Sequence, residues 1–568
     1  MSFEKEASSD VVFCKCCCSK RQKCGMLSVA ITGLVLSIVG GLLYLFYHLI
    51  FNAVVKEQTK IREGTLLYPE WVKPSQKVYV GFYLMNITNA EEFAAQKPGN
   101  FVKPIIEQKG PYTYRAYIEK DRIQPLDVFP KQISYRQTFP LYFEPELTVG
   151  SEDDWITTIN FIPLALGPFF KYVLSSPEAE NVTNIQKAAI YRTLNRLIED
   201  ANSTLITKYK AGEMLFGVRD PLLTSIIDVI NVVLNQTSLS HLVPISDLFG
   251  LFLIPNSTAG WHHFNAYTGE PDYHLTNMIT LYDNQTELDF WFDKTCNMIN
   301  GTDGTTRPPF SRREDIIYHY FPNACRSTYV KYTKDVTVKG VPGWEYRPPP
   351  EMFKAPRSSE ENKCFCEESD DSNYCIHDGG LYMAQCLFGA PLMISAPHFL
   401  HGDGFYLDKI IGMKPDYEEH TSSFVYEEHT GAAIMATKKL QFNLYVQPDE
   451  NIKISQIMDE YWAFPIMWVN GTYTINDEDA ELLYGLIVIS EIVVIVVEIL
   501  MFITGVGLLV YVSRYYVFVY KKVRTYEIHD KEQEESTSSK SSKKESVYKF
   551  TNGAYNTYNA DEDKKEML

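Results

Sequence analysis

The stretch MLSVAITGLVLSIVGGLLYLFYHLIF occupies residues 26–51 and contains no Asp, Glu, Lys or Arg. A helix rises about 1.5 Å per residue, so this run can cross a hydrocarbon core roughly 30 Å thick. It is also too long for the apolar part of a signal peptide. A second apolar run occupies residues 482–513, although it contains Glu491 and Glu498. The sequence therefore predicts two transmembrane helices, one near each end of the chain.

Basic residues predict how the two helices are oriented. They lie on the terminal side of each run: Lys15, Lys20, Arg21 and Lys23 before the first, and Arg514, Lys521, Lys522 and Arg524 after the second. Positive charge marks the cytoplasmic side of a membrane. We therefore expect cytoplasmic tails at residues 1–25 and 514–568, with residues 52–481 outside the cell or in a lumen. The Ser- and Lys-rich stretch at 536–546 predicts a disordered C-terminal tail.

Acceptor motifs for N-linked glycans agree with this topology. Eight Asn-X-Ser/Thr motifs lie between the two runs and none lies in the tails. Single motifs are weak signals, but their segregation is a strong one. The predicted glycosylation sites are Asn86, Asn181, Asn202, Asn235, Asn256, Asn284, Asn300 and Asn470.

The 11 cysteines fall into two groups. Six lie between the runs: Cys296, Cys325, Cys364, Cys366, Cys375 and Cys386. An even number in an oxidising compartment predicts three disulfides, and the sequence alone leaves about fifteen pairings open. The other five lie beside the first run and are candidates for palmitoylation: Cys14, Cys16, Cys17, Cys18 and Cys24. Unmodified thiols are the alternative, and a zinc site is disfavoured because the spacing is too tight.

Composition excludes several classes of protein. Of 568 residues 45% are hydrophobic, which excludes a disordered chain, and the net charge of −18 argues against a nucleic-acid partner. A mean hydropathy of −0.18 excludes a polytopic membrane bundle. No G-x-S-x-G, P-loop, H-E-x-x-H or G-x-G-x-x-G motif is present, so we expect neither an enzyme nor a cofactor. Tyr-Glu-Glu-His-Thr occurs at 417–421 and 426–430, and we interpret both copies as acidic surface loops rather than a metal site.

Residues 52–481 show no linker and no repeat, which predicts one large domain. Apolar–polar alternation predicts strands at 77–84, 112–118, 133–143, 328–336 and 440–446. Between residues 155 and 250 the pattern becomes helical, notably at 185–201 and 221–234. Basic residues in this helical part could bind an anionic particle, or they could be ordinary solvated positions: Lys171, Lys187, Arg192, Arg196, Lys208 and Lys210.

Several stretches in order resemble the class B scavenger receptor family over residues 26–513. They are EGT (63–65), EQKGPYTY (107–114), GVRDPLL (217–223), CNMINGTD (296–303), CFC (364–366) and PHFL (397–400). The resemblance implies an α+β ectodomain with an antiparallel β-barrel-like core, a helical apex at 155–250 and an internal hydrophobic tunnel. It also implies the disulfide pairs Cys296–Cys364, Cys325–Cys386 and Cys366–Cys375.

The functional expectation follows from the same resemblance. It implies a receptor that binds lipids or lipoproteins at the apex and passes fatty acid or sterol down the tunnel to the membrane. Two alternatives remain open: an endolysosomal receptor for a protein cargo, and a surface receptor for microbes or apoptotic cells. We expect the plasma membrane, with the lysosomal membrane as the alternative, and a homo-oligomer is possible.

Two further features have open interpretations. Glu491 and Glu498 are seven residues apart and share one helix face, which predicts a helix–helix contact or else a shifted span with both near the headgroups. The C-terminal residues Asp563, Glu566, Met567 and Leu568 resemble either an acidic sorting signal or a PDZ-type ligand. A plain solvated terminus is the third possibility.

Overall fold

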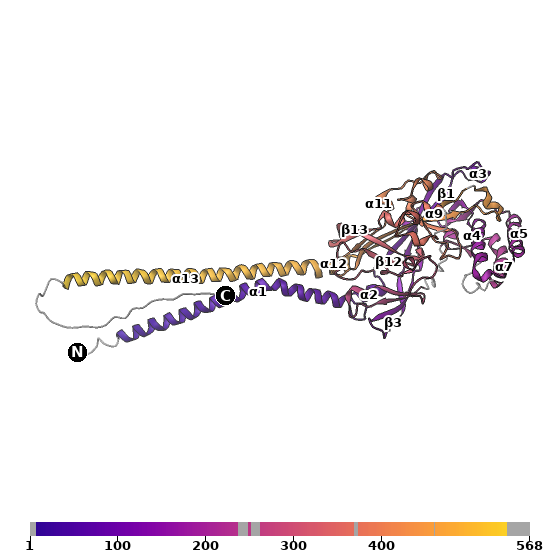
Figure 1. Cartoon of the computed structure of the whole chain (residues 1–568). Helices are drawn as coiled ribbons and strands as arrows, with labels where there is room; N and C mark the ends of the chain where they lie inside the picture. The colour runs from indigo at the N-terminus through magenta and orange to yellow at the C-terminus, as the bar shows by residue number, and fades with distance from the viewer. Residues whose placement is uncertain (1–6, 237–247, 252–261, 368–372, 459, 542–568) are drawn as a thin grey trace, which may run out of the picture. The chain divides into compact units, whose positions relative to one another are not determined.

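The computed structural model describes residues 7–236, 248–251, 262–367, 373–458 and 460–541 (Figure 1). The chain divides into two compact units. Of the described residues, those up to 47 and those from 491 onward form the first, which we call the terminal unit, and those from 48 to 490 form the second, which we call the body. Every strand of the described residues belongs to the body.

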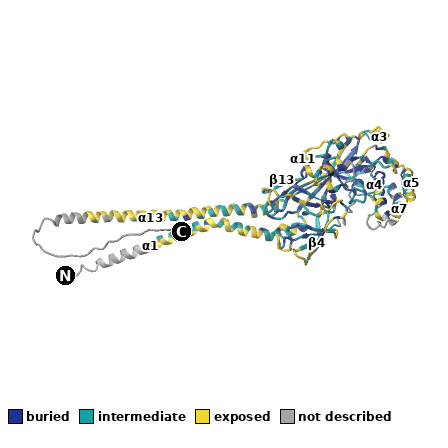
Figure 2. Cartoon of the chain, viewed as in Figure 1, coloured by how far each residue is buried: buried dark blue, intermediate teal, exposed yellow. Residues whose placement is uncertain are grey.

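Two long helices carry the apolar runs. They are α1 (Ala7–Gln58) and α13 (Ser490–Ser541), the latter preceded by α12 (Asp477–Tyr484) and a π-helical turn at Gly485–Ile489. Both are long and apolar enough to cross a membrane. Large apolar side chains lie exposed along them, as the yellow of Figure 2 shows, with Leu45 57% and Ile503 62% exposed. Lipid is the environment that covers such a surface without cost.

The C-terminal tail differs from the expectation. We predicted disorder for 514–568, but α13 continues to Ser541. Residues 514–541 contain neither Gly nor Pro and are rich in Lys, Arg and Glu, which favour helix once a preceding helix has nucleated it. The N-terminal tail is likewise helical from Ala7. Residues 542–568 lie outside the described residues, and with them the C-terminal candidates Asp563, Glu566, Met567 and Leu568.

An antiparallel sheet of 11 strands forms the centre of the body. Its main path runs β12 (Ile317–Phe321), β13 (Arg326–Val338), β14 (Val341–Arg347), β17 (Ser423–Tyr426), β18 (Ala433–Val446), β19 (Trp462–Thr474), β1 (Val78–Ile87), β2 (Ile106–Ala116) and β5 (Leu141–Phe143). The sheet forks along one edge of β18. β17 pairs with residues 433–437 of that strand, and β16 (Leu392–Ser395), itself paired with β15 (Leu381–Tyr382), pairs with residues 441–444. Residues 438–440 lie between these two pairings.

A second antiparallel sheet has four strands in the order β11 (Ile279–Tyr282), β10 (His262–Tyr267), β4 (Gln132–Thr138) and β3 (Glu119–Leu126). The single strand predicted at 133–143 is therefore wrong. The chain leaves β4 at Thr138 and enters the large sheet as β5 at Leu141, because Pro140 cannot donate a ladder hydrogen bond. The four other predicted strands overlap β1, β2, β13 and β18, and each differs from the observed strand at one end or both.

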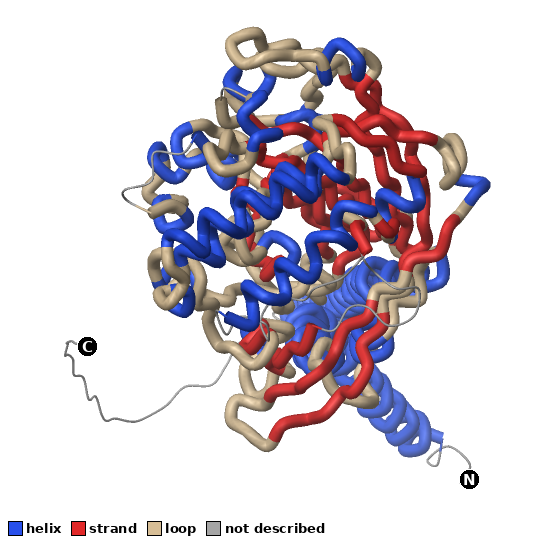
Figure 3. Tube along the Cα trace, turned by 90° about the vertical axis from the view of Figure 1, so that its right-hand side faces the viewer, coloured by secondary structure: helices blue, strands red, loops and turns tan. Residues whose placement is uncertain are grey.

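Three helices with their own apolar core form the region that we call the apex. They are α4 (Phe161–Ser175), α5 (Asn184–Asp200) and α7 (Pro221–Gln236), which confirms the helices predicted at 185–201 and 221–234. Thr183 and Gln186 cap α5 reciprocally, which fixes where that helix begins. Figure 3 shows the helices on one side of the strands, and within the body Figure 1 places α5 and α7 at the end opposite α12.

Short elements complete the body: α2 (Leu67–Val72), α3 (Ala90–Ala94), β6 (Trp155–Ile159), β7 (Ile206–Lys210), α6 (Ala211–Phe216), β8 (Val218–Arg219), β9 (Leu248–Phe249), α8 (Lys294–Asn297), α9 (Asn373–Ile376), α10 (Gly404–Leu407) and α11 (Tyr417–His420). The α+β class, the antiparallel strand-rich ectodomain and the two terminal helices are thus as predicted.

Candidate functional site

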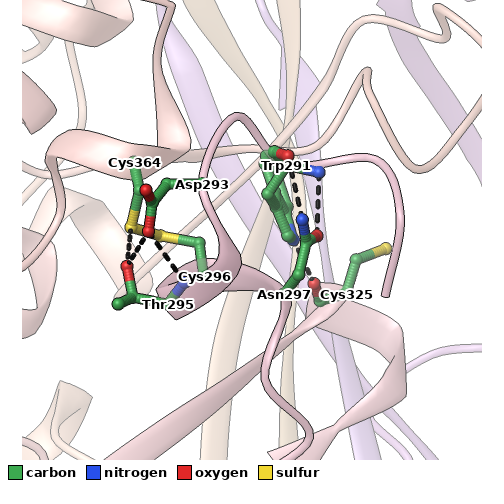
Figure 4. The surroundings of a disulfide bond; sticks show 7 residues. All are labelled: Trp291, Asp293, Thr295, Cys296, Asn297, Cys325 and Cys364. Carbon is green, nitrogen blue, oxygen red and sulfur yellow. Dashed lines mark hydrogen bonds between the residues drawn. A yellow bond between two sulfur atoms is a disulfide. The ribbon is translucent and has the colours of Figure 1, made fainter. Parts of the chain in front are cut away.

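Three disulfides join the loops of the body in the pairs that the resemblance implies: Cys296–Cys364, Cys325–Cys386 and Cys366–Cys375. Figure 4 shows the first, where Asp293 caps α8 and the Thr295 hydroxyl lies 3.2 Å from the Cys364 sulfur. The Trp291 indole nitrogen donates to the Cys325 carbonyl at 2.8 Å and so links this disulfide to the second.

A cavity of about 60 Å³ lies in the body beside the fork of the large sheet. Strands β12, β13, β15, β16, β17 and β18 all contribute to its walls, which are mainly apolar: Phe321, Val330, Phe353, Leu381, Ile394 and Leu440. Cys325 directly follows the wall residue Ala324, so the Cys325–Cys386 disulfide holds one side of the cavity. Ligand pockets usually measure about 300–1,000 Å³. The space fits a water or a headgroup rather than an acyl chain, so the tunnel that the resemblance implies stays a prediction.

Polar groups also reach this cavity. Asp303 lies 3.0 Å from the buried Lys120 ammonium and accepts hydrogen bonds from Asn277 at 2.7 Å and from Thr305 at 2.6 Å. Burial alone would raise the pKa of Asp303, but Lys120 and the hydrogen bonds outweigh it and lower the pKa. Asp303 is therefore an ionised carboxylate whose charge Lys120 balances.

His319 is the neutral member of the cavity wall. Its Nε2 lies 2.8 Å from the Tyr426 hydroxyl, which donates to the Gly304 carbonyl at 3.1 Å. Burial, reinforced by the positive charge of Lys438, lowers the pKa of His319 to about 4. The ring therefore carries no charge at pH 7.

A second buried polar cluster joins two of the stretches that resemble the family. Gln108 accepts at its Oε1 from His398 Nε2 at 2.9 Å and from Trp468 Nε1 at 2.7 Å. The other His398 ring nitrogen accepts from the Lys414 amide at 3.0 Å, which assigns the neutral tautomer. The His420 ring stacks on it with centroids 4.4 Å apart, and burial followed by this neighbour lowers the pKa of His398 to about 4. The cluster ties the turn that contains His398 to β2 through Gln108 and to β19 through Trp468.

A larger, open hollow of about 450 Å³ lies at the apex. Asn195, Ile198 and Asn202 line it from α5 and the loop that follows, and Lys453, whose amide donates to the Asn195 side-chain oxygen at 2.9 Å, also lines it. Lys453 also bridges the hollow to Glu199 at 2.8 Å. Because Asn202 is a predicted glycan acceptor, a glycan there would occupy part of this hollow.

The six basic apex candidates do not act as one group. Four are engaged within the body: Lys187 donates to the Leu174 carbonyl at 2.6 Å, Arg192 donates to the Ala188 carbonyl at 3.2 Å, Arg196 lies 3.8 Å from Asp200, and Lys210 lies 2.8 Å from Asp153. Lys171 and Lys208 are exposed on α4 and β7. Binding of an anionic particle by these residues stays a prediction.

The predicted glycan acceptors separate by burial. Asn181, Asn202 and Asn284 are exposed, and Asn300 and Asn470 are half-buried. Asn86 differs from the other acceptors: it lies on β1 at 9% exposure, and its side-chain oxygen accepts from the Thr157 amide at 2.9 Å. A glycan would have to displace this contact, so we no longer expect one at Asn86. The side chain of Asn235 and the whole of Asn256 lie outside the described residues.

The remaining candidate residues lie in the terminal unit. Cys14, Cys16, Cys17 and Cys18 lie in the first part of α1, and Cys24 is a free, exposed thiol. Palmitoylation stays a prediction. Glu491 accepts from the Tyr44 hydroxyl of α1 at 3.4 Å, and Glu498 is half-buried on the face of α13 that meets Gly40. Both glutamates therefore face α1, which agrees with the helix–helix alternative.

Among the described residues, no cluster of three His, Cys, Asp or Glu side chains could hold a metal ion. The repeated Tyr-Glu-Glu-His-Thr nevertheless differs from our interpretation as surface loops. His420 is buried at the end of α11, and Glu427 is fully buried, where it accepts from the backbone amides of His429 and Thr430. Each copy stabilises a turn.

Sequence reasoning missed Lys438, which lines the body cavity. We predicted a strand from residue 440, whereas β18 begins at Ala433. Extending the alternation backwards places Lys438 on the same face as Leu440 and Lys439 on the other. A pair of lysines inside a strand was therefore the available signal that one of them points inward.

Comparisons with known proteins agree on one family. The family model described as CD36 family matches residues 31–516. Lysosome membrane protein 2 of Mus musculus is 30% identical over 441 residues, which cover 77% of this chain and 83% of the relative. The protein of the same name from Rattus norvegicus is 29% identical over 445 residues, with shares of 77% and 83%.

A second kind of relative matches a longer stretch at lower identity. Scavenger receptor class B member 1 of Cricetulus griseus is 24% identical over 498 residues, which cover 87% of this chain and 89% of the relative.

Proposed function

The chain belongs to the CD36 family, and from that premise we propose that it is a receptor that binds lipids or lipoprotein-like particles at its apex and passes lipid through the body to the membrane. Moving an acyl chain through water carries a penalty of about 0.8 kcal/mol per CH₂ group. A passage with apolar walls removes this penalty, and the concentration gradient then drives net flow without catalysis. The plasma membrane is the proposed location, with both termini cytoplasmic.

The apolar walls of the body cavity are the observation that carries this proposal. Its lining comes from six strands that surround the fork in the large sheet. The cavity is too small for an acyl chain, so transport requires the walls to separate. Met352 and Leu440 are half-buried wall residues, and a methionine side chain adapts its shape easily. We therefore propose that the lipid path widens at this wall.

Uptake by cells that express the full chain tests the proposal. Radiolabelled cholesteryl oleate and oleate, delivered on a carrier, should enter these cells faster than control cells. Leu440→Trp fills the cavity and should return uptake to the control level, while Lys331→Trp on an exposed position of β13 should leave it unchanged. Surface amounts of each variant are measured in parallel, because overpacking can cost about 1–3 kcal/mol. Equal uptake with and without the chain would contradict the proposal.

An endolysosomal receptor for a protein cargo is the second candidate. The 30% identity to a lysosome membrane protein favours it. Microscopy of the tagged full chain separates the two: a lysosomal pattern with no lipid uptake supports the cargo receptor. Recognition of microbes or apoptotic cells remains the third alternative and predicts a surface pattern with particle binding.

A further inference from the structure

Lys438 occupies an unusual place in β18. It lies at the fork, between the residues that pair with β17 and those that pair with β16. Its side chain lies deep in the protein and lines the body cavity. Much of the surface of this lysine is nevertheless accessible to solvent. The accessible surface of this lysine therefore faces the internal space rather than the outside.

The lysine lacks an anion. Its ammonium lies 3.4 Å from the centroid of the Phe321 ring, and among the described residues it makes no ion pair or hydrogen bond. Asp303, the carboxylate in the same wall, is already paired with Lys120 at 3.0 Å. His319 is neutral, as shown above. The cavity thus contains one cation in excess of its anions.

Burial makes this excess cation costly. It lowers the pKa of Lys438 to about 7, and the charge of Asp303 acts in the opposite direction. An uncompensated buried charge is unfavourable, and a ligand anion beside it removes much of that cost. The apolar walls on either side favour an anion that carries a hydrocarbon chain.

We propose that Lys438 binds the carboxylate of a long-chain acyl ligand inside the body, so that this route selects anionic lipids over neutral ones. The carboxylate occupies the cavity of about 60 Å³ and the chain lies between the separated apolar walls. The inference rests on the proposed lipid function, and it adds a residue that sets specificity. It makes Lys438 a binding residue, with no covalent step.

The first test compares two ligands of equal chain length. Radiolabelled oleate and oleyl alcohol are titrated onto the purified full-length chain in detergent, with detergent alone subtracted. We expect Lys438→Met to weaken oleate binding about tenfold, the loss of one charge-assisted contact, and oleyl alcohol binding less than about twofold. Lys438→Arg should retain oleate binding. Lys439→Met is the matched control, because its side chain lies on the opposite face of β18 and donates to the Glu419 carbonyl.

The second test needs no variant. Besides Lys438, the titratable groups that line the cavity are Asp303, His319, Tyr320 and Tyr329. The pKa of Asp303 is lowered, the pKa of His319 is about 4, and burial raises the pKa of both tyrosines, so between pH 7 and 9 only Lys438 changes charge. Oleate binding to the wild-type chain should fall about tenfold or more from pH 7 to 9, while oleyl alcohol binding stays level.

The outcomes separate the two proposals. If the wild-type chain binds both ligands and Lys438→Met weakens both equally or neither, the inference about Lys438 is wrong and the lipid function stands. If oleate binding does not change with pH, the inference is likewise overturned. If the wild-type chain binds neither ligand, the lipid function fails and the inference fails with it.

Discussion

The ion pair of Lys120 and Asp303 lies inside the body with both side chains almost fully buried. The two charged atoms lie 3.0 Å apart, and Lys120 also donates to the Trp71 carbonyl at 2.9 Å. Removing one partner of such a pair leaves an uncompensated charge, which costs about 3–5 kcal/mol. We expect Asp303→Asn to lower the free energy of unfolding by this amount, measured by urea unfolding of the full chain in detergent.

A double variant provides the control for this pair. Lys120→Met combined with Asp303→Asn removes both charges, so it should be more stable than Asp303→Asn alone. Equal stability of the single and double variants would show that the pair is not the source of the loss. The pKa of Asp303 is lowered, so its contribution is present above about pH 4 and disappears as the pH falls through the folded-state pKa.

Two buried histidines predict a loss of stability in mild acid. The pKa of His319 and of His398 is about 4 in the folded chain, against about 6.5 when unfolded. Between these values the unfolded state binds more protons, so stability falls as the pH falls, by up to about 1.4 kcal/mol per unit for each ring. The melting temperature should therefore drop from pH 6.5 to pH 4.5. His319→Gln should flatten this slope, and the same change at the exposed His274 should not.

At the scale of elements, the contact of α1 with α13 depends on small residues. A Cβ atom placed on Gly505 would lie 2.4 Å from the Ser37 hydroxyl oxygen and 2.7 Å from the Gly33 carbonyl oxygen. Close approach of backbones is how helices pack in lipid, where apolar burial supplies no driving force. We expect Gly505→Leu to cost about 1–3 kcal/mol and to lower the melting temperature of the full chain.

Gly507 is the matched control for this contact. It lies two residues further along α13, and a Cβ there meets nothing within 4 Å. Gly507→Leu should leave the melting temperature unchanged. If both substitutions have the same effect, the helices do not pack through Gly505.

The sequence predicted correctly those elements that pack one face against one core. Alternation located β1, β2, β13 and β18, and helical spacing located α5 and α7, because one face of each meets one core. The prediction of a single strand at 133–143 failed because the apolar–polar alternation continues across Pro140, while the chain passes from one sheet to the other there. Lys438 escaped notice for a related reason: spacing says which face a residue takes, but not that the sheet forks there. Internal sites depend on tertiary pairing, which a sequence pattern does not contain.

At the scale of the molecule, the disulfides tie distant segments of the body together. The Cys325–Cys386 bond spans 61 residues and holds the cavity wall near Ala324. Cysteine spacing predicts that three bonds form, but the pairing came from the resemblance, because fifteen arrangements fit the count equally well. The Lys and Arg residues beside the apolar runs and the glycan acceptor motifs predict the membrane topology more directly. Both depend on the side of the membrane on which a segment lies, and not on how the chain packs.

Glycopeptide mass spectrometry of the full chain, expressed in cells that glycosylate secreted proteins, tests the topology and the burial of acceptors together. Exposed Asn181, Asn202 and Asn284 should carry glycans because their side chains are accessible. Asn86 should remain bare, because its side chain is buried on β1 and bonded to the Thr157 amide. A bare Asn181, Asn202 and Asn284 would place the body on the cytoplasmic side and refute the topology. A glycan at Asn86 would instead leave the topology intact and show that β1 pairs with its neighbours only after the oligosaccharide has been attached.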